Sequence, residues 1–445
     1  MQKLKVLHVV TLISAAGTQA WASDDFFGDI EIDSATAKHS NTSILKGFVL
    51  QKAKYGIESP NSEFEHERQT RGLEQVRTDI FAEIANDIND TWKFRLSAKA
   101  ELDYVEWSDD EHDFGIQASR TFVRDAFLDA SFDNGSWLRI GNQVFAWGES
   151  ESLTISDVLA VRDQREFGQA ELQDIREPIP AVMYQVPLEH RHFDSGKLSM
   201  VISYRAGSDR FGDTQDAFYP YIALKNTDIT LSKQDPKNEW EYALKYDLQF
   251  SGGDLSLLIA DVNNNDFTFN GLERNTITLS QERVSVASAA ISRVLNSWLF
   301  KTELGYYKNQ AVNQGFNHFR TDQMRGMAGL EYSGINNWRM SFEVVGLSNS
   351  DQPTLQSTQT STSNSAPGYT LHIQQSAFNE KIEQHFWLIS LPESEGSVYR
   401  WDLNYDWSDS ITLSSGVVLY SAEPEALLYP YKGNDTLNFS VKYNY

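Results

Sequence analysis

The last nine residues read Leu437-Asn438-Phe439-Ser440-Val441-Lys442-Tyr443-Asn444-Tyr445. Every second residue is apolar or aromatic and the residues between are polar, which is the period of a β-strand with two different faces. A soluble edge strand more often carries charge on its exposed face, because charge discourages pairing with other chains. This stretch instead keeps an unbroken apolar stripe and ends on an aromatic ring. It predicts a strand with lipid on one side and water on the other.

The same period of two recurs upstream in segments of about ten residues that short turns separate. In one example Val123 to Phe132 passes through Asp133-Asn134-Gly135 into Trp137 to Gly141, and Asn-Gly favours a tight hairpin. Seventeen such segments are clear or fair, and Tyr369 to Gln374 supplies an eighteenth that restores the even number of single-chain barrels. Apart from that one, the expected strands begin at about Gly47, Val76, Trp92, Thr121, Trp137, Ala181, Leu198, Glu239, Leu255, Arg283, Trp298, Gln323, Trp338, Ile382, Val398, Ile411 and Thr436.

Short turns alternate with long polar connections, such as 208–237, 263–281 and 348–368. Short turns on one side and long loops on the other are typical of outer-membrane barrels. Seven tryptophans also lie at strand ends, where their rings suit the lipid headgroup level: Trp92, Trp107, Trp137, Trp240, Trp298, Trp338 and Trp407. We therefore expect residues 43–445 to form an all-β, transmembrane, antiparallel up-and-down barrel of about 18 strands (16–18), with short periplasmic turns and long extracellular loops.

The C-terminal stripe also resembles the assembly signal of Gram-negative outer-membrane proteins, in which an amphipathic last strand ends on an aromatic residue. The resemblance implies recognition by the barrel-assembly machinery and a location in the outer membrane, in contact with its lipid and lipopolysaccharide. The residues that carry it are Leu437, Phe439, Val441, Tyr443 and Tyr445.

The N-terminus has the three parts of a secretory signal. Lys3 and Lys5 precede an apolar stretch over 6–16, and Ala20-Trp21-Ala22 offers small residues at a cleavage point. An anchor helix is disfavoured, because the apolar stretch is well short of the roughly 20 residues that span a bilayer. We expect a signal peptide over 1–22, followed by a periplasmic N-terminal segment over 23–42.

The composition of the 445 residues excludes several classes of protein. The mean hydropathy of −0.45 argues against a helical membrane protein. The chain has no cysteine, so it has neither disulfides nor cysteine metal sites. With 62 Asp and Glu against 38 Lys and Arg, the formal net charge of −24 repels the phosphates of nucleic acids. Its 11 Trp, 19 Tyr and 25 Phe exclude a wholly disordered chain.

No sequence pattern indicates catalysis: the chain lacks a phosphate loop, a dinucleotide fingerprint and a nucleophile elbow. An outer-membrane phospholipase is the enzyme alternative, but the serine and histidine signature it requires is missing. We expect no enzymatic activity and no cofactor. One acidic run is a candidate cation site, which would hold calcium or bridge divalent ions to lipopolysaccharide phosphates. The ligands of this site would be Asp109, Asp110, Glu111 and Asp113. A solvated acidic loop is the simpler interpretation.

The connection between Val144 and Ala181 differs from the other long connections. It loses the period of two, mixes both signs of charge and carries short apolar runs. These features predict a segment over 145–180 that folds inside the lumen, pairs with the wall and constricts the bore. The alternative is an extracellular loop packed on its neighbours. The candidate residues are Trp147, Gly148, Glu149, Asp157, Arg162, Arg165, Glu166, Arg176, Pro178 and Pro180.

The runs 139–150, 157–158 and 176–180 also resemble the hallmark region of a domain-of-unknown-function family. Its members are Gram-negative outer-membrane barrels, often encoded beside RND-type exporters and a periplasmic lipid-binding-like protein; alginate-export barrels are a more distant likeness. The resemblance implies transport of lipidic or other apolar molecules across the outer membrane, together with an inner-membrane pump. It implies no catalytic residue.

Three functions remain open on the sequence alone. The leading hypothesis is a channel or shuttle for a hydrophobic or amphipathic molecule. The second is a general diffusion or alginate-export-like porin, in which inward charges select a hydrophilic solute. The third is an adhesion or structural barrel whose loops bind surfaces.

Overall fold

The computed structural model describes residues 44–58, 72–107, 112–151, 155–169, 175–191, 193–204, 207–212, 216, 218–225, 227–350, 367–391, 395–424 and 426–445. The predicted signal peptide (1–22) and the predicted periplasmic segment (23–42) lie outside the described residues.

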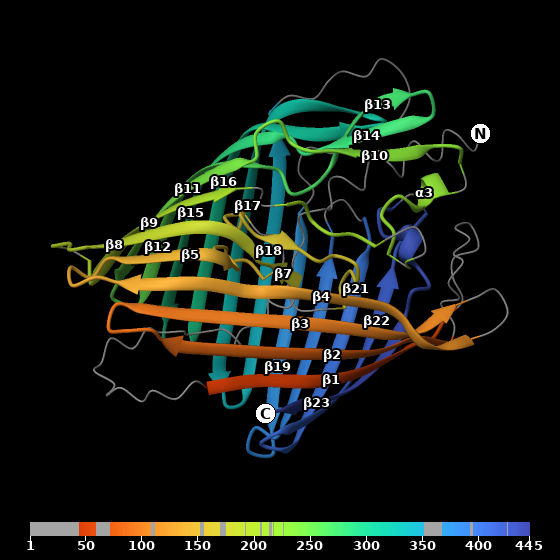
Figure 1. Cartoon of the computed structure of the whole chain (residues 1–445), viewed down its shortest axis with the longest axis horizontal. Helices are drawn as coiled ribbons and strands as arrows, with labels where there is room; N and C mark the ends of the chain where they lie inside the picture. Colours follow the sequence, from red (N-terminus) through yellow and green to blue (C-terminus); the bar gives the residue numbers. More distant parts are fainter. Residues whose placement is uncertain are drawn as a thin grey trace.

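The chain forms a closed antiparallel β-barrel of 18 strands (Figure 1). The first strand pairs with the last, from Phe48 opposite Asn444 to Gly56 opposite Thr436, and this pairing closes the wall. In ring order the strands are β1 (Ile44–Gly56), β2 (Gly72–Asp87), β3 (Trp92–Trp107), β4 (His112–Ser131), β5 (Trp137–Gln143), β8 (Ile179–Leu188), β9 (Ser195–Tyr204), β11 (Trp240–Phe250), β12 (Gly253–Asn263), β15 (Arg283–Leu295), β16 (Trp298–Gln314), β17 (Asn317–Ile335), β18 (Trp338–Asn349), β19 (Gly368–Ala377), β20 (Ile382–Ser390), β21 (Ser397–Ser408), β22 (Ile411–Ser421) and β23 (Thr436–Asn444).

The predicted fold class and strand count are confirmed. The eighteenth strand, inferred from 369–374, is β19. The short turns use the residues that left-handed backbone angles favour: Gly135 has a φ of 76°, Asn296 of 56° and Asn337 of 66°. Asn and Gly tolerate these angles at little steric cost, so each turn joins its two strands within a few residues.

The long connections are more structured than the sequence analysis anticipates. Part of 208–237 and of 263–281 forms a second, three-stranded sheet of β10 (Thr230–Gln234), β13 (Thr268–Glu273) and β14 (Thr276–Ser280). A short helix, α3 (Ile222–Lys225), precedes it. This sheet lies at one end of the barrel (Figure 1). Its strands β10 and β14 are parallel and come from different connections, so no local hairpin signal marks the pairing.

The two faces of the wall differ in polarity. Along β16, Trp298, Phe300 and Leu304 are exposed on the outside, whereas Lys301 and Glu303 are buried on the inside. A closed wall leaves no unpaired strand edge, and its apolar outer band suits hydrocarbon, so the protein is an outer-membrane barrel. No helix in the described part of the chain has the length and apolar content to cross a bilayer.

A substitution on β12 tests this assignment of faces. Leu257 is 43% exposed on the outer face, midway along its strand. Leu257→Lys is expected to cost about 2–4 kcal/mol in the free energy of unfolding, because it places a charge near the middle of the bilayer. Ser256→Lys, on the inner face beside Asp247, should cost far less. Urea unfolding in lipid vesicles measures both, and equal losses would contradict the assignment.

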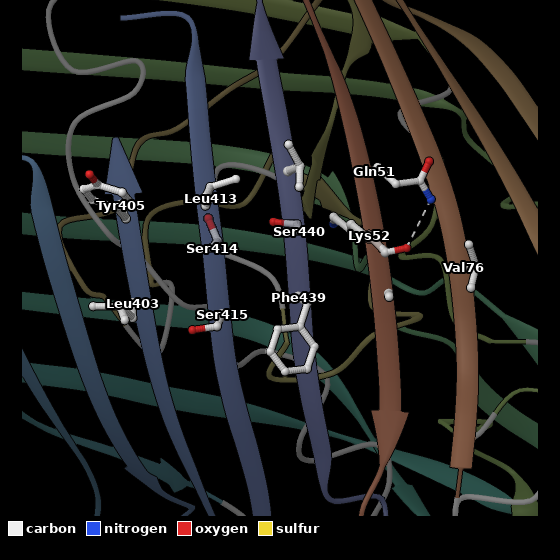
Figure 2. Close-up of a pocket in the computed structure, with 12 residues that line it drawn as sticks. Gln51, Lys52, Val76, Leu403, Tyr405, Leu413, Ser414, Ser415, Phe439 and Ser440 are labelled. Atoms are coloured by element: carbon white, nitrogen blue, oxygen red, sulfur yellow. Dashed lines mark hydrogen bonds between the residues drawn. The ribbon is translucent and has the colours of Figure 1, made fainter. Parts of the chain in front are cut away.

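The C-terminal strand β23 turns its apolar stripe outward, with Phe439 54% exposed and Val441 47% exposed. These two side chains help to line a groove of about 510 Å³ at the β1–β23 seam (Figure 2). The groove also contains outward-facing Leu413 and Tyr405, so it faces lipid and is not the bore. The role of the stripe in assembly stays a prediction.

Candidate constriction segment

The chain between β5 and β8 carries its own short hairpin, β6 (Val161–Arg162) with β7 (Arg176–Glu177). Ile155, Leu159 and Val161 of this segment are buried against inward-facing wall residues such as Leu258 and Val286. The segment therefore lies against the inner face of the wall, where apolar anchors and charged partners hold it.

On one side of the barrel the segment binds β16. The backbone N–H of Ser156 donates to Glu303 Oε1 at 2.5 Å, and the N–H of Glu149 donates to Glu303 Oε2 at 3.2 Å. The hydroxyl of Tyr307 donates to the carbonyl oxygen of Ile155. Glu303 therefore accepts hydrogen bonds from two places in the segment and holds both of them against the wall.

A buried ion-pair cluster lies next to this contact. The ammonium group of Lys301 is 2.9 Å from Glu151 Oε1 and 3.3 Å from Glu343 Oε1, and His372 Nδ1 is 3.4 Å from Glu151 Oε2. The Ser150 hydroxyl and the Glu151 N–H both donate to Glu343 Oε2 at 2.9 Å. Burial alone would raise the pKa of Glu151, but the hydrogen bond with His372 and the charge of Lys301 outweigh it and hold this pKa at about 2.

On the other side the segment binds β3 and β4. Arg120 reaches Asp163, which directly follows β6, at 3.1 Å, and Glu177 of β7 at 2.6 Å. One wall arginine therefore contacts both sides of the short hairpin. Arg165 of the segment reaches Glu101 at 3.1 Å. These pairs are partly buried and use the charge-assisted geometry in which Arg is strongest.

The two sets of contacts lie on opposite sides of the barrel. Glu166 pairs with Arg77 of β2 at 3.0 Å, whereas Ser156 binds β16. In the ring of 18 strands β2 is second and β16 is eleventh, so they are nine places apart, the largest separation that the ring allows. Ten residues of chain thus connect opposing walls.

Several predicted residues stabilise the segment internally. Asp157 accepts a hydrogen bond from the Trp147 N–H at 3.0 Å and pairs with Arg176 at 2.9 Å and Arg162 at 3.7 Å. Gly148 packs on the same aspartate, since a Cβ at Gly148 would lie 3.5 Å from the Asp157 Cβ. The carboxylate of Asp157 therefore organises the segment around one buried charge.

Pro180 requires a correction. The sequence pattern predicts that the whole of 145–180 lies in the lumen, but β8 begins at Ile179, and Pro180 is exposed on the outer face of this wall strand. Side chains alternate faces along a strand, so Ile179 points inward and Pro180 cannot. The segment ends at Pro178, which is half-buried.

A small polar cavity of about 40 Å³ lies between the segment and the loops that follow β9 and β12. Asp209 lies in this cavity and accepts hydrogen bonds from the Arg162 N–H at 3.0 Å and from the Gln164 side chain at 2.6 Å. Burial raises the pKa of Asp209 to about 6, and it raises the pKa of Asp266 well above its usual range, with the Asp209 charge adding to the effect. Burial therefore favours the protonated form of Asp209, while the hydrogen bonds from Arg162 and Gln164 favour the charged form and only partly offset this effect.

The raised pKa of Asp209 predicts a pH dependence of this contact. A carboxyl whose folded pKa exceeds its unfolded value stabilises the fold at low pH, and that stabilisation is lost as the pH rises from about 4 through about 6. Amide hydrogen exchange at residues 162–164, corrected for the intrinsic rate, should become less protected over this range. Asp209→Asn should abolish the change, and an unaltered pH profile in that variant would contradict the assignment.

The metal-site candidates receive no structural support. Asp109, Asp110 and Glu111 lie outside the described residues, and only the backbone of Asp113 is described. Among the side chains that the structure describes, no group of three His, Asp or Glu residues could hold a metal ion.

The wall partners of the segment were missed by the sequence analysis. Lys301, Glu303 and Glu343 each interrupt an apolar stretch at an inward position of a strand. The two-residue alternation along each strand therefore indicates from the sequence that these charges face the lumen. It does not show which inward charges meet the segment, because the answer depends on the closure of the ring.

The sequence matches, over residues 4–445, the model of a family described as "Protein of unknown function (DUF1302)", in line with the resemblance noted in the sequence. No curated protein matches it.

The chain is also similar to solved outer-membrane barrels. A structure of Acinetobacter baumannii OccAB3 is 10% identical, with 90% of this chain and 99% of that chain covered and a TM-score of 0.48. Salmonella typhi OmpF in complex with daunomycin is 9% identical, with 91% and 98% covered and a TM-score of 0.43. A Rh. blastica porin mutant is 11% identical, with 91% and 100% covered and a TM-score of 0.41.

Proposed function

This chain belongs to the DUF1302 family, and we propose that it is an outer-membrane channel for a hydrophobic or amphipathic molecule, with a bore that residues 145–178 narrow. The observation that carries the proposal is the set of buried contacts from this segment to opposing walls, at β2 and at β16. A segment anchored on both sides of a barrel limits the passage between them.

The surfaces around the segment favour a cargo with both apolar and polar parts. Trp147 packs edge-to-face on Phe145 with ring centroids 5.4 Å apart, and Lys245 Nζ lies 5.8 Å from the Trp147 ring. Glu149 is close by, and burial raises the pKa of its carboxyl against the opposing charges of Lys245 and Lys301. Rings beside charges can desolvate and orient an amphipathic molecule without making or breaking a bond.

The ion-pair clusters on the inner wall favour a second candidate, a porin for hydrophilic solutes. Lys99 and Glu101 on β3, for example, face the interior 3.1 Å apart. Liposome swelling with sugars and single-channel recording distinguish the two: large, steady conductance with sugar flux indicates a porin. A bore that excludes sugars but passes amphipathic molecules indicates the proposed channel.

We further propose that the barrel acts with periplasmic partners, namely an RND-type inner-membrane pump and a lipid-binding carrier. The family resemblance in the sequence motivates this part of the proposal. Co-purification of the barrel with such a pump from cross-linked cells tests it, and a barrel that exports its cargo equally well in a strain without any pump would contradict it.

The double substitution Trp147→Ala and Glu149→Ala tests the segment directly. We expect a changed conductance or cargo flux with little change in barrel stability, because the segment adds no lipid-facing area. The measurement is single-channel recording together with heat-modifiable gel mobility. Normal mobility with wild-type conductance would argue against a role in permeation, and lost mobility would assign the two residues to folding.

A further inference from the structure

The tip of the segment places one carboxylate in a basic cage. Glu166 Oε1 lies 3.0 Å from Arg77, 3.3 Å from Lys54 and 3.2 Å from the side-chain amide of Gln75. These donors come from the inner faces of β1 and β2, and Lys52 of β1 adds a further positive charge nearby. Although burial would raise the pKa of Glu166, these cations hold it well below its usual range.

The cage contains more positive than negative charge before the segment arrives. Two wall carboxylates contact it: Asp79, 2.9 Å from Arg77 and 3.9 Å from Lys52, and Asp103, 3.1 Å from the side-chain amide of Gln75. Lys52, Lys54 and Arg77 therefore exceed Asp79 and Asp103 by one charge, and the carboxylate of Glu166 balances it. A partly buried excess of cations with forked donors suits a carboxylate.

The next residue of the tip, Phe167, is partly buried against apolar side chains. Phe167 packs on a cluster that includes Trp387, Val398 and Val418, and its ring centroid is 6.5 Å from that of Tyr431. Since β22, which carries Val418, is separated from β1 only by β23, the apolar cluster adjoins the cage on the wall. Glu166 and Phe167 together present a carboxylate and a hydrophobic group side by side.

The tip is held by side chains and not by a β-ladder. Residues 165–169 form a turn, and the Tyr420 hydroxyl donates to the Phe167 carbonyl oxygen at 2.5 Å. The tip can therefore leave this part of the wall without breaking any strand pairing of the barrel.

We infer that the cage of Lys52, Lys54, Arg77 and Gln75, with the adjoining apolar cluster, is a binding site for an amphipathic carboxylate, and that Glu166 and Phe167 occupy it as a tethered mimic of the cargo. The inference rests on the proposed function and names the chemical class of its substrate: a monocarboxylate with an apolar group. Such a molecule competes with the tip for the same donors and the same apolar surface.

A tethered competitor acts at an effective concentration on the order of millimolar, so removing it exposes the affinity of the site. We would measure binding of 3-phenylpropionate to the detergent-solubilised barrel by isothermal titration calorimetry. The variant Glu166→Ala with Phe167→Ala should bind this probe about tenfold or more tightly than the wild type. Adding Lys54→Gln and Arg77→Gln to that variant should abolish the gain.

Two controls make the result specific. Glu177→Ala removes another segment carboxylate, paired with Arg120 outside the cage, and should leave the affinity at the wild-type value. The neutral 3-phenylpropanamide should bind none of the variants appreciably. Equal affinity of the probe for wild type, Glu177→Ala and the tip variant, or equal binding of the amide, would overturn the inference. Should the double variant fail to fold, Glu166→Gln takes its place; it should also bind the probe more tightly than the wild type, but by a smaller factor, because Phe167 still occupies the apolar cluster.

The calorimetric assay requires no permeation, so the two proposals can fail separately. If the tip variant gains affinity but neither it nor the wild type passes ions or solutes, the binding site is supported and the proposed channel function is wrong. If the wild type conducts but no variant binds the carboxylate, the channel stands and this substrate class is wrong.

Discussion

Replacing Lys301 with methionine is expected to lower the free energy of unfolding by about 3–5 kcal/mol, because it leaves two buried carboxylates without their shared cation. Lys301 contacts Glu151 of the segment and Glu343 of the wall, and all three side chains are less than a tenth exposed. Methionine keeps most of the side-chain volume of lysine, so the loss of unfolding free energy measures the missing charge and not an empty cavity. Urea unfolding followed by tryptophan fluorescence in lipid vesicles measures it.

Two variants control for this result. Lys93→Met removes a cation whose side chain is 56% exposed and whose partner Asp87 is 48% exposed, and it should cost at most about 1 kcal/mol. Adding Glu343→Gln to Lys301→Met should recover a large part of the loss, since it removes one unpaired charge. If Lys301→Met costs no more than Lys93→Met, the cluster does not hold the segment to the wall.

The same substitution should also change the channel. Lys301 and His372 hold the first half of the segment at Glu151, so removing Lys301 loosens the segment at that residue. We expect single-channel records with larger current fluctuations than the wild type, while Lys93→Met should give quiet records. Equally quiet records from both variants would mean that Glu303 alone is enough to fix the segment.

The barrel is predictable from the sequence because every lipid-crossing strand obeys the same rule. Each of the 18 strands must show apolar side chains to hydrocarbon at every second position, and short turns such as Asn296-Ser297 interrupt the pattern where the chain reverses. Even β19, whose alternating pattern is the weakest, follows from the rule that single-chain barrels have an even number of strands. In contrast, β10 and β14 pair across some 40 residues, and nothing local in either stretch indicates its partner.

The sequence predicts where the candidate segment lies in the chain, but it does not predict which residues the segment contacts. Mixed charges and the loss of the two-residue period mark the segment, and both features are visible in the sequence. The contact between Glu166 and Arg77 is not, because it joins residues that only barrel closure and the folding of the segment bring together. Pro180 shows the limit of reading by composition, since a strand begins one residue before it and turns its side chain outward.

The second large effect is expected from removing the segment. Gln143 at the end of β5 pairs directly with Ile179 at the start of β8, so a short glycine-serine linker can replace residues 149–177 without stretching the wall. The barrel strands keep all their ladder partners. The deleted residues contribute nothing to the lipid-facing band, and heat-modifiable gel mobility should therefore remain that of a folded barrel.

The single-channel conductance of this deletion variant, recorded beside the wild type in the same planar bilayer, is the most direct test of the central claim. We predict a several-fold rise in conductance, because the chain that connects β2 to β16 across the barrel is gone. A folded deletion variant with the conductance of the wild type would show that residues 145–178 do not narrow the bore.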